Sequence, residues 1–276
     1  MNRFYFIVFF ILLFFVFPLH ADTNGNPFVL VIDPGHGGKA TGAIGKRGKE
    51  KDINLAVSKL VKQYISEAHP DVKIVMTRTR DVAVDLDERA DMANKVNANL
   101  FISIHSNSIR KNHQLNGCEV YTFGLSRSEE NLEVAKRENS VILLEDNYKE
   151  KYEDFDPNSS ESYIIFEFMQ NKFVEQSVDF ATMVQKQLVK TAHREDLGVK
   201  QAEFLVLRKS TMPRILIELD FISNPEAEQF MLSKEGQETL AHSICNAFTE
   251  YKKDFDRKTT AQTESDTHQQ RLKKDL

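Results

Sequence analysis

Two kinds of hydrophobic pattern alternate along most of the chain. Short segments rich in apolar and β-branched residues predict buried strands at residues 28–32, 72–77, 100–104, 119–123, 204–207 and 215–219. Apolar residues three and four positions apart predict helices at residues 52–64, 86–96, 225–232 and 237–251, with a further helix near residues 173–191. Because strands and helices follow one another in turn, we expect an α/β fold with helices on both faces of a sheet.

Three segments depart from this alternation. Residues 125–172 contain a charged, helix-like segment and then a polar stretch, which predicts an insertion between the fourth strand and the next helix. Residues 255–276 contain few apolar residues, so we expect a disordered tail there. Residues 4–17 form an uncharged apolar run between Arg3 and Ala21, which is typical of a secretory signal peptide over residues 1–21.

The apolar run also has an alternative interpretation as a retained membrane anchor. It is shorter than the roughly 20 residues that span a bilayer, so we favour cleavage, with no stable membrane span afterwards. The protein would then be secreted across the inner membrane into the periplasm or cell envelope.

Charge and cysteine content narrow the possible functions. The chain has 36 basic and 41 acidic residues and a net charge of −5, so no overall basic field indicates nucleic acid as a partner. Its two cysteines, Cys118 and Cys245, could pair in an oxidising compartment. We favour free, buried thiols, because both lie in apolar patterns.

Candidate metal ligands follow the predicted strands. His36 comes just after the first strand, His105 ends the third, and Glu50 follows a glycine-rich loop at the start of a helix. Ligands collect at the carboxyl ends of strands in open α/β sheets, and two imidazoles with one carboxylate can hold zinc and leave a position open. Glu218 ends another buried strand, where it could act as a general base.

Spacing alone does not settle this interpretation. Each histidine could be an ordinary hydrogen-bonded residue, and Glu50 could be a carboxylate favoured by a helix start. The motifs taken together are more specific. They resemble the zinc-dependent N-acetylmuramoyl-L-alanine amidases of bacterial cell walls at residues 31–38, 50–52, 77–78, 89, 93–94, 101–107, 217–219 and 221–224.

The resemblance implies a fold, a site and a reaction. The fold would be a single α/β domain over residues 28–252, with a mixed, largely parallel sheet of about six strands. Zn²⁺ would be held by His36, Glu50 and His105, and Glu218 would be the catalytic carboxylate. The reaction would be hydrolysis of the amide between N-acetylmuramic acid and L-alanine in peptidoglycan, for wall remodelling or separation of daughter cells, by an enzyme that we expect to be monomeric.

The resemblance also gives the insertion a function. Some of these amidases contain an inserted helix that covers the zinc cleft until a partner protein displaces it. We therefore expect residues 125–172 to be an autoinhibitory lid opened by an activator protein, with Glu138 or Glu145 on the zinc. For the insertion, the alternative is a solvated helix without a regulatory function. For the whole protein, the alternatives to an amidase are a catalytically silent peptidoglycan-binding scaffold and a metallopeptidase that cuts within stem peptides.

Overall fold

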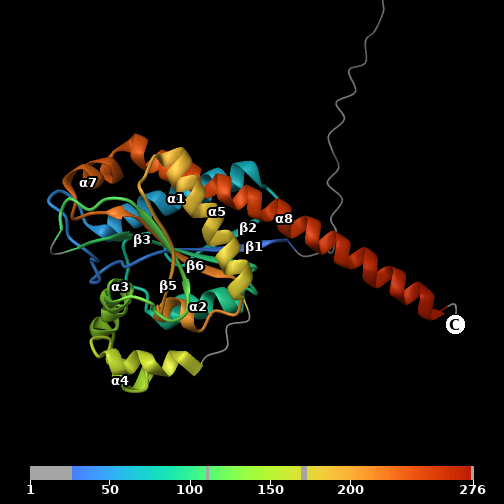
Figure 1. Ribbon diagram of the computed structural model, residues 1–276, viewed down its shortest axis with the longest axis horizontal. Helices are drawn as coiled ribbons and strands as arrows, with labels where there is room; N and C mark the ends of the chain where they lie inside the picture. The colour runs from blue at the N-terminus through green and yellow to red at the C-terminus, as the bar shows by residue number, and fades with distance from the viewer. Residues whose placement is uncertain (1–26, 110–111, 169–172, 275–276) are drawn as a thin grey trace, which may run out of the picture.

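A six-stranded mixed sheet forms the centre of the computed structural model, which describes residues 27–109, 112–168 and 173–274 (Figure 1). The strands are β1 (Val29–Pro34), β2 (Lys73–Met76), β3 (Leu100–Asn107), β4 (Cys118–Phe123), β5 (Asp196–Ala202) and β6 (Arg214–Phe221). Their order is β2-β1-β3-β6-β4-β5, in which β4 runs antiparallel to β6 and every other neighbouring pair is parallel. The expected α/β fold with a mixed, largely parallel sheet is confirmed.

Helices cover both faces of this sheet, as Figure 1 shows. One face packs against α1 (Glu50–Ala68), α5 (Val174–Ala192) and α8 (Lys234–Lys274), and α7 (Pro225–Leu232) lies at one end of that layer. The other face packs against α2 (Leu86–Lys95) and α6 (Leu205–Arg208). Side chains alternate along a strand, so Leu100, Ile102 and Ile104 of β3 enter the first core. Phe101 enters the second core, and His105 follows on that second face.

The residues of the predicted insertion build a small helical layer over the second face. They form α3 (Glu129–Asn139), η1 (Ser140–Leu144), α4 (Tyr148–Lys151) and η2 (Ser160–Phe168), between β4 and α5. Ala135, Ile142 and Tyr152 are almost fully buried and belong to the same core as Phe101. The insertion is therefore packed against the domain rather than solvated on all sides.

One predicted strand was wrong, and one strand of the sheet was not predicted. Residues 205–207 lie in α6, with Phe204 as its N-cap, and do not form a strand. A short apolar run that is buried on all sides has no periodicity to distinguish a strand from a helix. The fifth strand is instead β5, which lies at the sheet edge and is too polar to give an apolar run.

The predicted disordered tail was also wrong over most of its length, because α8 continues to Lys274. No Gly or Pro interrupts residues 255–274, and Phe255 anchors the helix by packing edge-on against Phe28 at 5.0 Å. A packed helical segment supplies the nucleus from which further turns extend at low cost.

Cys118 and Cys245 are both free and buried, in agreement with the favoured interpretation. The predicted signal peptide over residues 1–21 lies outside the described residues. Among the residues that are described, no helix is both long and apolar enough to cross a membrane.

Candidate metal centre

The two predicted histidine ligands meet at the carboxyl ends of β1 and β3. The backbone at Gly35 lies so close to the His105 ring that a side chain at Gly35 would collide with that ring. His36 adopts a φ of 61°, an uncommon conformation for a residue with a side chain. It is held there by Arg89, whose Nη2 donates to the His36 carbonyl at 2.9 Å. The imidazole centroids lie 4.9 Å apart.

Asp33 stabilises the loop that carries His36. Its buried carboxylate accepts hydrogen bonds from Arg89 Nη1 at 2.7 Å, Thr77 Oγ1 at 2.5 Å and Ser103 Oγ at 2.7 Å. Burial alone would raise the pKa of Asp33, but Arg89 and the two hydroxyls hold the pKa below its ordinary value. The Asp33–Arg89 pair thus fixes the loop that presents His36.

Glu50 reaches the same point from the first turn of α1. Its Oε2 accepts from the Ala43 amide at 2.7 Å, and its Oε1 accepts from the Ser106 amide at 3.1 Å. The Glu50 amide in turn donates to the Ala43 carbonyl at 2.9 Å. The glycine-rich loop therefore folds back and orients a carboxylate that is only 1% exposed.

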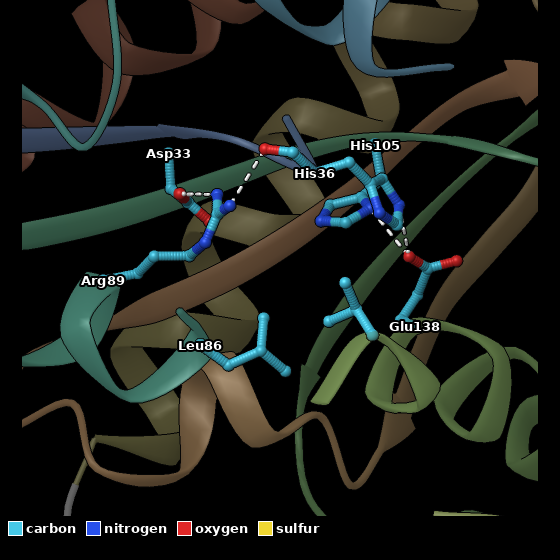
Figure 2. A pocket seen from close by; sticks show the side chains of 7 residues that line it. Asp33, His36, Leu86, Arg89, His105 and Glu138 are labelled. Carbon is cyan, nitrogen blue, oxygen red and sulfur yellow. Dashed lines mark hydrogen bonds and ion pairs between the residues drawn. The ribbon is translucent and has the colours of Figure 1, made fainter. Parts of the chain in front are cut away.

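A fourth donor comes from the inserted helix α3. Glu138 Oε2 lies 2.9 Å from both His36 Nε2 and His105 Nδ1, and Glu50 Oε1 lies 3.1 Å from the same two nitrogens. Figure 2 shows Glu138 reaching from α3 toward the two rings, in a pocket also lined by Leu86 and Val141. One donor atom from each of the four residues lies within 4.8 Å of the others.

These four donors fit a metal ion. Tetrahedral ligands about 2.0–2.1 Å from zinc lie roughly 3.3 Å from one another, close to the observed separations. His36 Nε2 and Glu138 Oε2 are buried without hydrogen-bond geometry to any partner in the described chain, although they lie 2.9 Å apart. Atoms that are this close without bonding one another are expected when their lone pairs point to a common centre.

The charges of the four donor residues also indicate a metal ion. Burial alone would lower the pKa of His36, but the Glu50 and Glu138 carboxylates raise it to about 10. Burial would raise the pKa of Glu138, whereas Arg137 and both histidines hold it well below its ordinary value. Two buried carboxylates therefore require nearby positive charge, which a divalent cation between neutral imidazoles would supply.

Glu218 lies beside the four donors on the neighbouring strand. It pairs in register with His105 across β3 and β6, on the same face of the sheet. Glu218 is fully buried, and its Oε2 has no hydrogen-bond partner among the described residues. Burial and Glu138 raise its pKa well above the ordinary value, against the opposing charge of Arg137.

Sequence reasoning did not identify Arg137. Its Nε donates to Glu138 Oε1 at 2.8 Å, its Nη2 lies 3.3 Å from Glu218 Oε1, and its Nη1 donates to the Ser108 carbonyl at 2.7 Å. Its position in the sequence could have indicated this role, because a basic residue next to a proposed lid carboxylate can balance the charge of that carboxylate.

Of the two lid carboxylates considered from the sequence, only Glu138 reaches the donors. Glu145 instead accepts from the Leu86 amide at 3.0 Å, at the start of α2, and from Tyr152 Oη at 2.8 Å. It attaches the middle of the insertion to the start of α2.

Comparisons with known proteins identify the family of this chain. The sequence profile of the N-acetylmuramoyl-L-alanine amidase family matches residues 30–250. The amidase AmiA of Escherichia coli K12 is 30% identical over 237 residues, which are 86% of this chain and 80% of AmiA. The chain belongs to the N-acetylmuramoyl-L-alanine amidase family.

Solved structures agree with this assignment. The N-acetylmuramoyl-L-alanine amidase of Clostridium difficile 630 superposes with a TM-score of 0.62 at 28% identity, covering 82% of this chain and 97% of that one. The catalytic domain of CwlV, an amidase of Paenibacillus polymyxa var. colistinus, gives a TM-score of 0.59 at 28% identity and covers 81% and 97% of the two chains. This chain is accordingly an amidase that acts on peptidoglycan.

Proposed function

We propose that the chain is a zinc-dependent peptidoglycan amidase whose inserted helix keeps it inactive. His36, Glu50 and His105 would hold the zinc, Glu218 would transfer protons, and Glu138 would block the position that water and substrate need. The observation that supports this most directly is the approach of Glu138 Oε2 to within 2.9 Å of both imidazoles.

The three resident ligands are built into the sheet and α1, whereas Glu138 belongs to the insertion. When bound, zinc supplies Lewis-acid chemistry that polarises a carbonyl and activates water. His36 and His105 would contribute neutral imidazoles and Glu50 one negative charge, which leaves a net positive site for the substrate carbonyl. Glu138 would cancel that charge.

Glu218 is placed to move the proton that hydrolysis requires. Its carboxylate would accept a proton from the attacking water and deliver it to the amine nitrogen of L-alanine as the amide bond breaks. Burial and the neighbouring carboxylates raise its pKa above the ordinary value, which makes Glu218 a stronger proton acceptor than a free carboxylate. In the closed arrangement Arg137 lies 3.3 Å from Glu218 Oε1 and opposes that role.

Residues 137 and 138 would therefore inhibit two parts of the site at once. Arg137 would contact Glu218 and weaken it as a proton acceptor, and Glu138 would occupy the donor cluster. Asn139 fixes the end of α3, because its Nδ2 donates to the Glu203 carbonyl at 2.8 Å and its Oδ1 accepts from the Leu205 amide at 2.8 Å. The lid is thus attached both at the site and to the domain beside it.

Activation would require a partner that binds the open lid more tightly than the closed one. The structure of the CwlD amidase from Clostridioides difficile is a complex with the GerS lipoprotein, which gives a precedent for a protein partner of this fold. We propose export by residues 1–21, since peptidoglycan lies outside the cytoplasmic membrane.

Digestion of purified peptidoglycan with and without a chelator tests the proposed function. We expect stem peptides with a free L-alanine amino group, seen by mass spectrometry, from the lid-opened variant Glu138→Ala, and no release after chelation. Cleavage inside the stems would indicate a metallopeptidase. Binding of peptidoglycan without cleavage, by a zinc-loaded protein, would indicate a scaffold.

A further inference from the structure

The loop between β1 and α1 is positively charged although the chain as a whole has a net charge of −5. Residues 38–49 contain no acidic residue and four exposed cationic side chains, Lys39, Lys46, Arg47 and Lys49. Over the described ranges, no carboxylate forms an ion pair with any of the four. Other lysines near the site are paired, as in Lys51–Asp81, Lys151–Asp85 and Lys200–Glu119. The loop therefore presents a group of cations that the fold itself does not use.

This loop is fixed rather than free. Glu228 of α7 is only 1% exposed, and its Oε1 accepts hydrogen bonds from the amides of Arg47 at 2.7 Å and Gly48 at 2.9 Å. The Gly45 amide donates to the Gly48 carbonyl at 3.0 Å, which closes the tip as a tight turn. A buried carboxylate that holds two backbone amides keeps the tip in one conformation, and a pre-organised loop loses less entropy when it binds a ligand.

The loop is also joined directly to the metal centre. It begins just after His36 and ends just before Glu50, and its middle lies against both. A side chain at Gly42 would place its Cβ 2.5 Å from Glu50 Oε2 and 2.7 Å from the His36 ring. In Figure 1 the loop, in blue, lies at the same end of the sheet as α7. The middle of this cationic loop therefore forms part of the wall of the metal centre.

We propose that residues 39–49 form a subsite for the free carboxylates of the peptide stem of peptidoglycan, with Lys46 and Arg47 at its tip. This inference rests on the proposed function, because the stem extends from the amide that the site would cleave. An extended peptide advances about 3.3–3.6 Å per residue, so carboxylates two or three residues along the stem lie roughly 7–11 Å from that amide. Ile44, which is 68% exposed in the same loop, adds an apolar contact for the stem.

Equilibrium binding of soluble peptidoglycan fragments to the full chain tests the subsite. Glu138→Ala opens the site in the proposed function and Glu218→Gln prevents turnover, so both changes form the background. We compare fragments whose stem carboxylates are free with fragments in which they are amidated. Lys46→Gln with Arg47→Gln should weaken binding of the free-carboxylate fragments by about 5- to 25-fold, since each exposed ion pair contributes up to about fivefold.

The matched control removes the same charge elsewhere. Lys59 and Lys62 are exposed on α1, outside the loop, and Lys59→Gln with Lys62→Gln should change binding less than twofold. Amidated fragments should bind the background and the loop variant equally. Equal binding of free and amidated fragments by the background would overturn the subsite, as would equal losses in the loop and α1 variants.

Other outcomes separate the subsite from the proposed function. If the loop variant lost affinity only for phosphate-rich wall polymers, the loop would bind a different anion and our inference would be wrong. Chelator-sensitive release of L-alanine-terminated stems by the Glu138→Ala enzyme would support the amidase function even then. Failure of that release, with carboxylate-dependent binding intact, would refute the proposed reaction and leave the subsite standing.

Discussion

Replacing Glu138 by Ala removes the contact between the inserted helix and the metal centre. The wild-type carboxylate lies 2.9 Å from His36 Nε2 and from His105 Nδ1, and 2.8 Å from Arg137 Nε. A hydrogen bond to a charged group contributes about 1.5–3 kcal/mol. A closed state favoured by about 3 kcal/mol would leave under roughly 1% of molecules open, because each 1.4 kcal/mol is tenfold.

The expected result is a rise in basal activity. Losing most of that preference would open about half of the molecules, so hydrolysis should increase roughly 10- to 100-fold. Asn139 and Glu145 still hold the lid to the domain, which favours the lower part of this range. Deletion of about 130–165, bridged by Gly and Ser, should give at least as large an increase. The assay is release of soluble fragments from purified peptidoglycan, with zinc content measured on each preparation.

Glu133→Ala is the matched control, because it removes an exposed carboxylate from the same helix, where Glu133 pairs with Lys136 at the surface. Its activity should equal that of the parent. A folded, zinc-loaded Glu138→Ala enzyme no faster than the parent would refute the lid. An equal increase in both variants would show that the helix, and not the carboxylate at the metal centre, matters.

Three further predictions concern the centre and its support. In the Glu138→Ala background, Glu218→Gln should keep zinc and fold but lose activity by about 10²-fold or more, in single-turnover assays; near-normal turnover would exclude Glu218 as the proton carrier. The parent should contain about one zinc per chain, and His105→Ala should lose it on dialysis, measured by elemental analysis; unchanged zinc affinity would remove His105 from the ligand set. Asp33→Asn should lower the free energy of unfolding by about 3–5 kcal/mol, because Arg89 is left buried without its carboxylate. Since the folded-state pKa of Asp33 is lowered, this stabilisation is present at neutral pH and lost as the pH falls below about 4. The urea-unfolding difference between parent and Asp33→Asn should therefore shrink in acid, and a difference independent of pH would contradict that pKa.

The proximity of His36, Glu50 and His105 could be predicted from the sequence because strand ends meet at one edge of an α/β sheet. Their roles as zinc ligands remain predictions. The sequence could not identify which carboxylate of the insertion contacts these residues; it left two candidates, Glu138 and Glu145. Which of Glu138 and Glu145 points to the centre depends on how α3 packs through Ala135, and a charge pattern does not encode that.

The errors have a common physical origin. Residues 204–207 are buried on all sides, so their apolar run fits a strand and a helix equally well. β5 is an edge strand with half-exposed positions, and only its pairing with β4 defines it. The helix beyond residue 255 depends on the packed segment before it and on the contact of Phe255 with Phe28. In each case tertiary contacts, rather than the local sequence, determine the structure.

Because the insertion caps α2, the start of that helix would report movement of the proposed lid. Its first two amides are satisfied by Glu145 and by Tyr152 Oη, not by its own N-cap residue Asp85. Opening would break both hydrogen bonds and expose the amide groups of Leu86 and Asp87 to solvent. The Arg89 amide would stay bonded to the Asp85 carbonyl at 3.2 Å. The deuterium exchange rate at Leu86 and Asp87, relative to Arg89, would therefore measure how often the lid lifts, in the unlabelled wild-type protein and without any turnover.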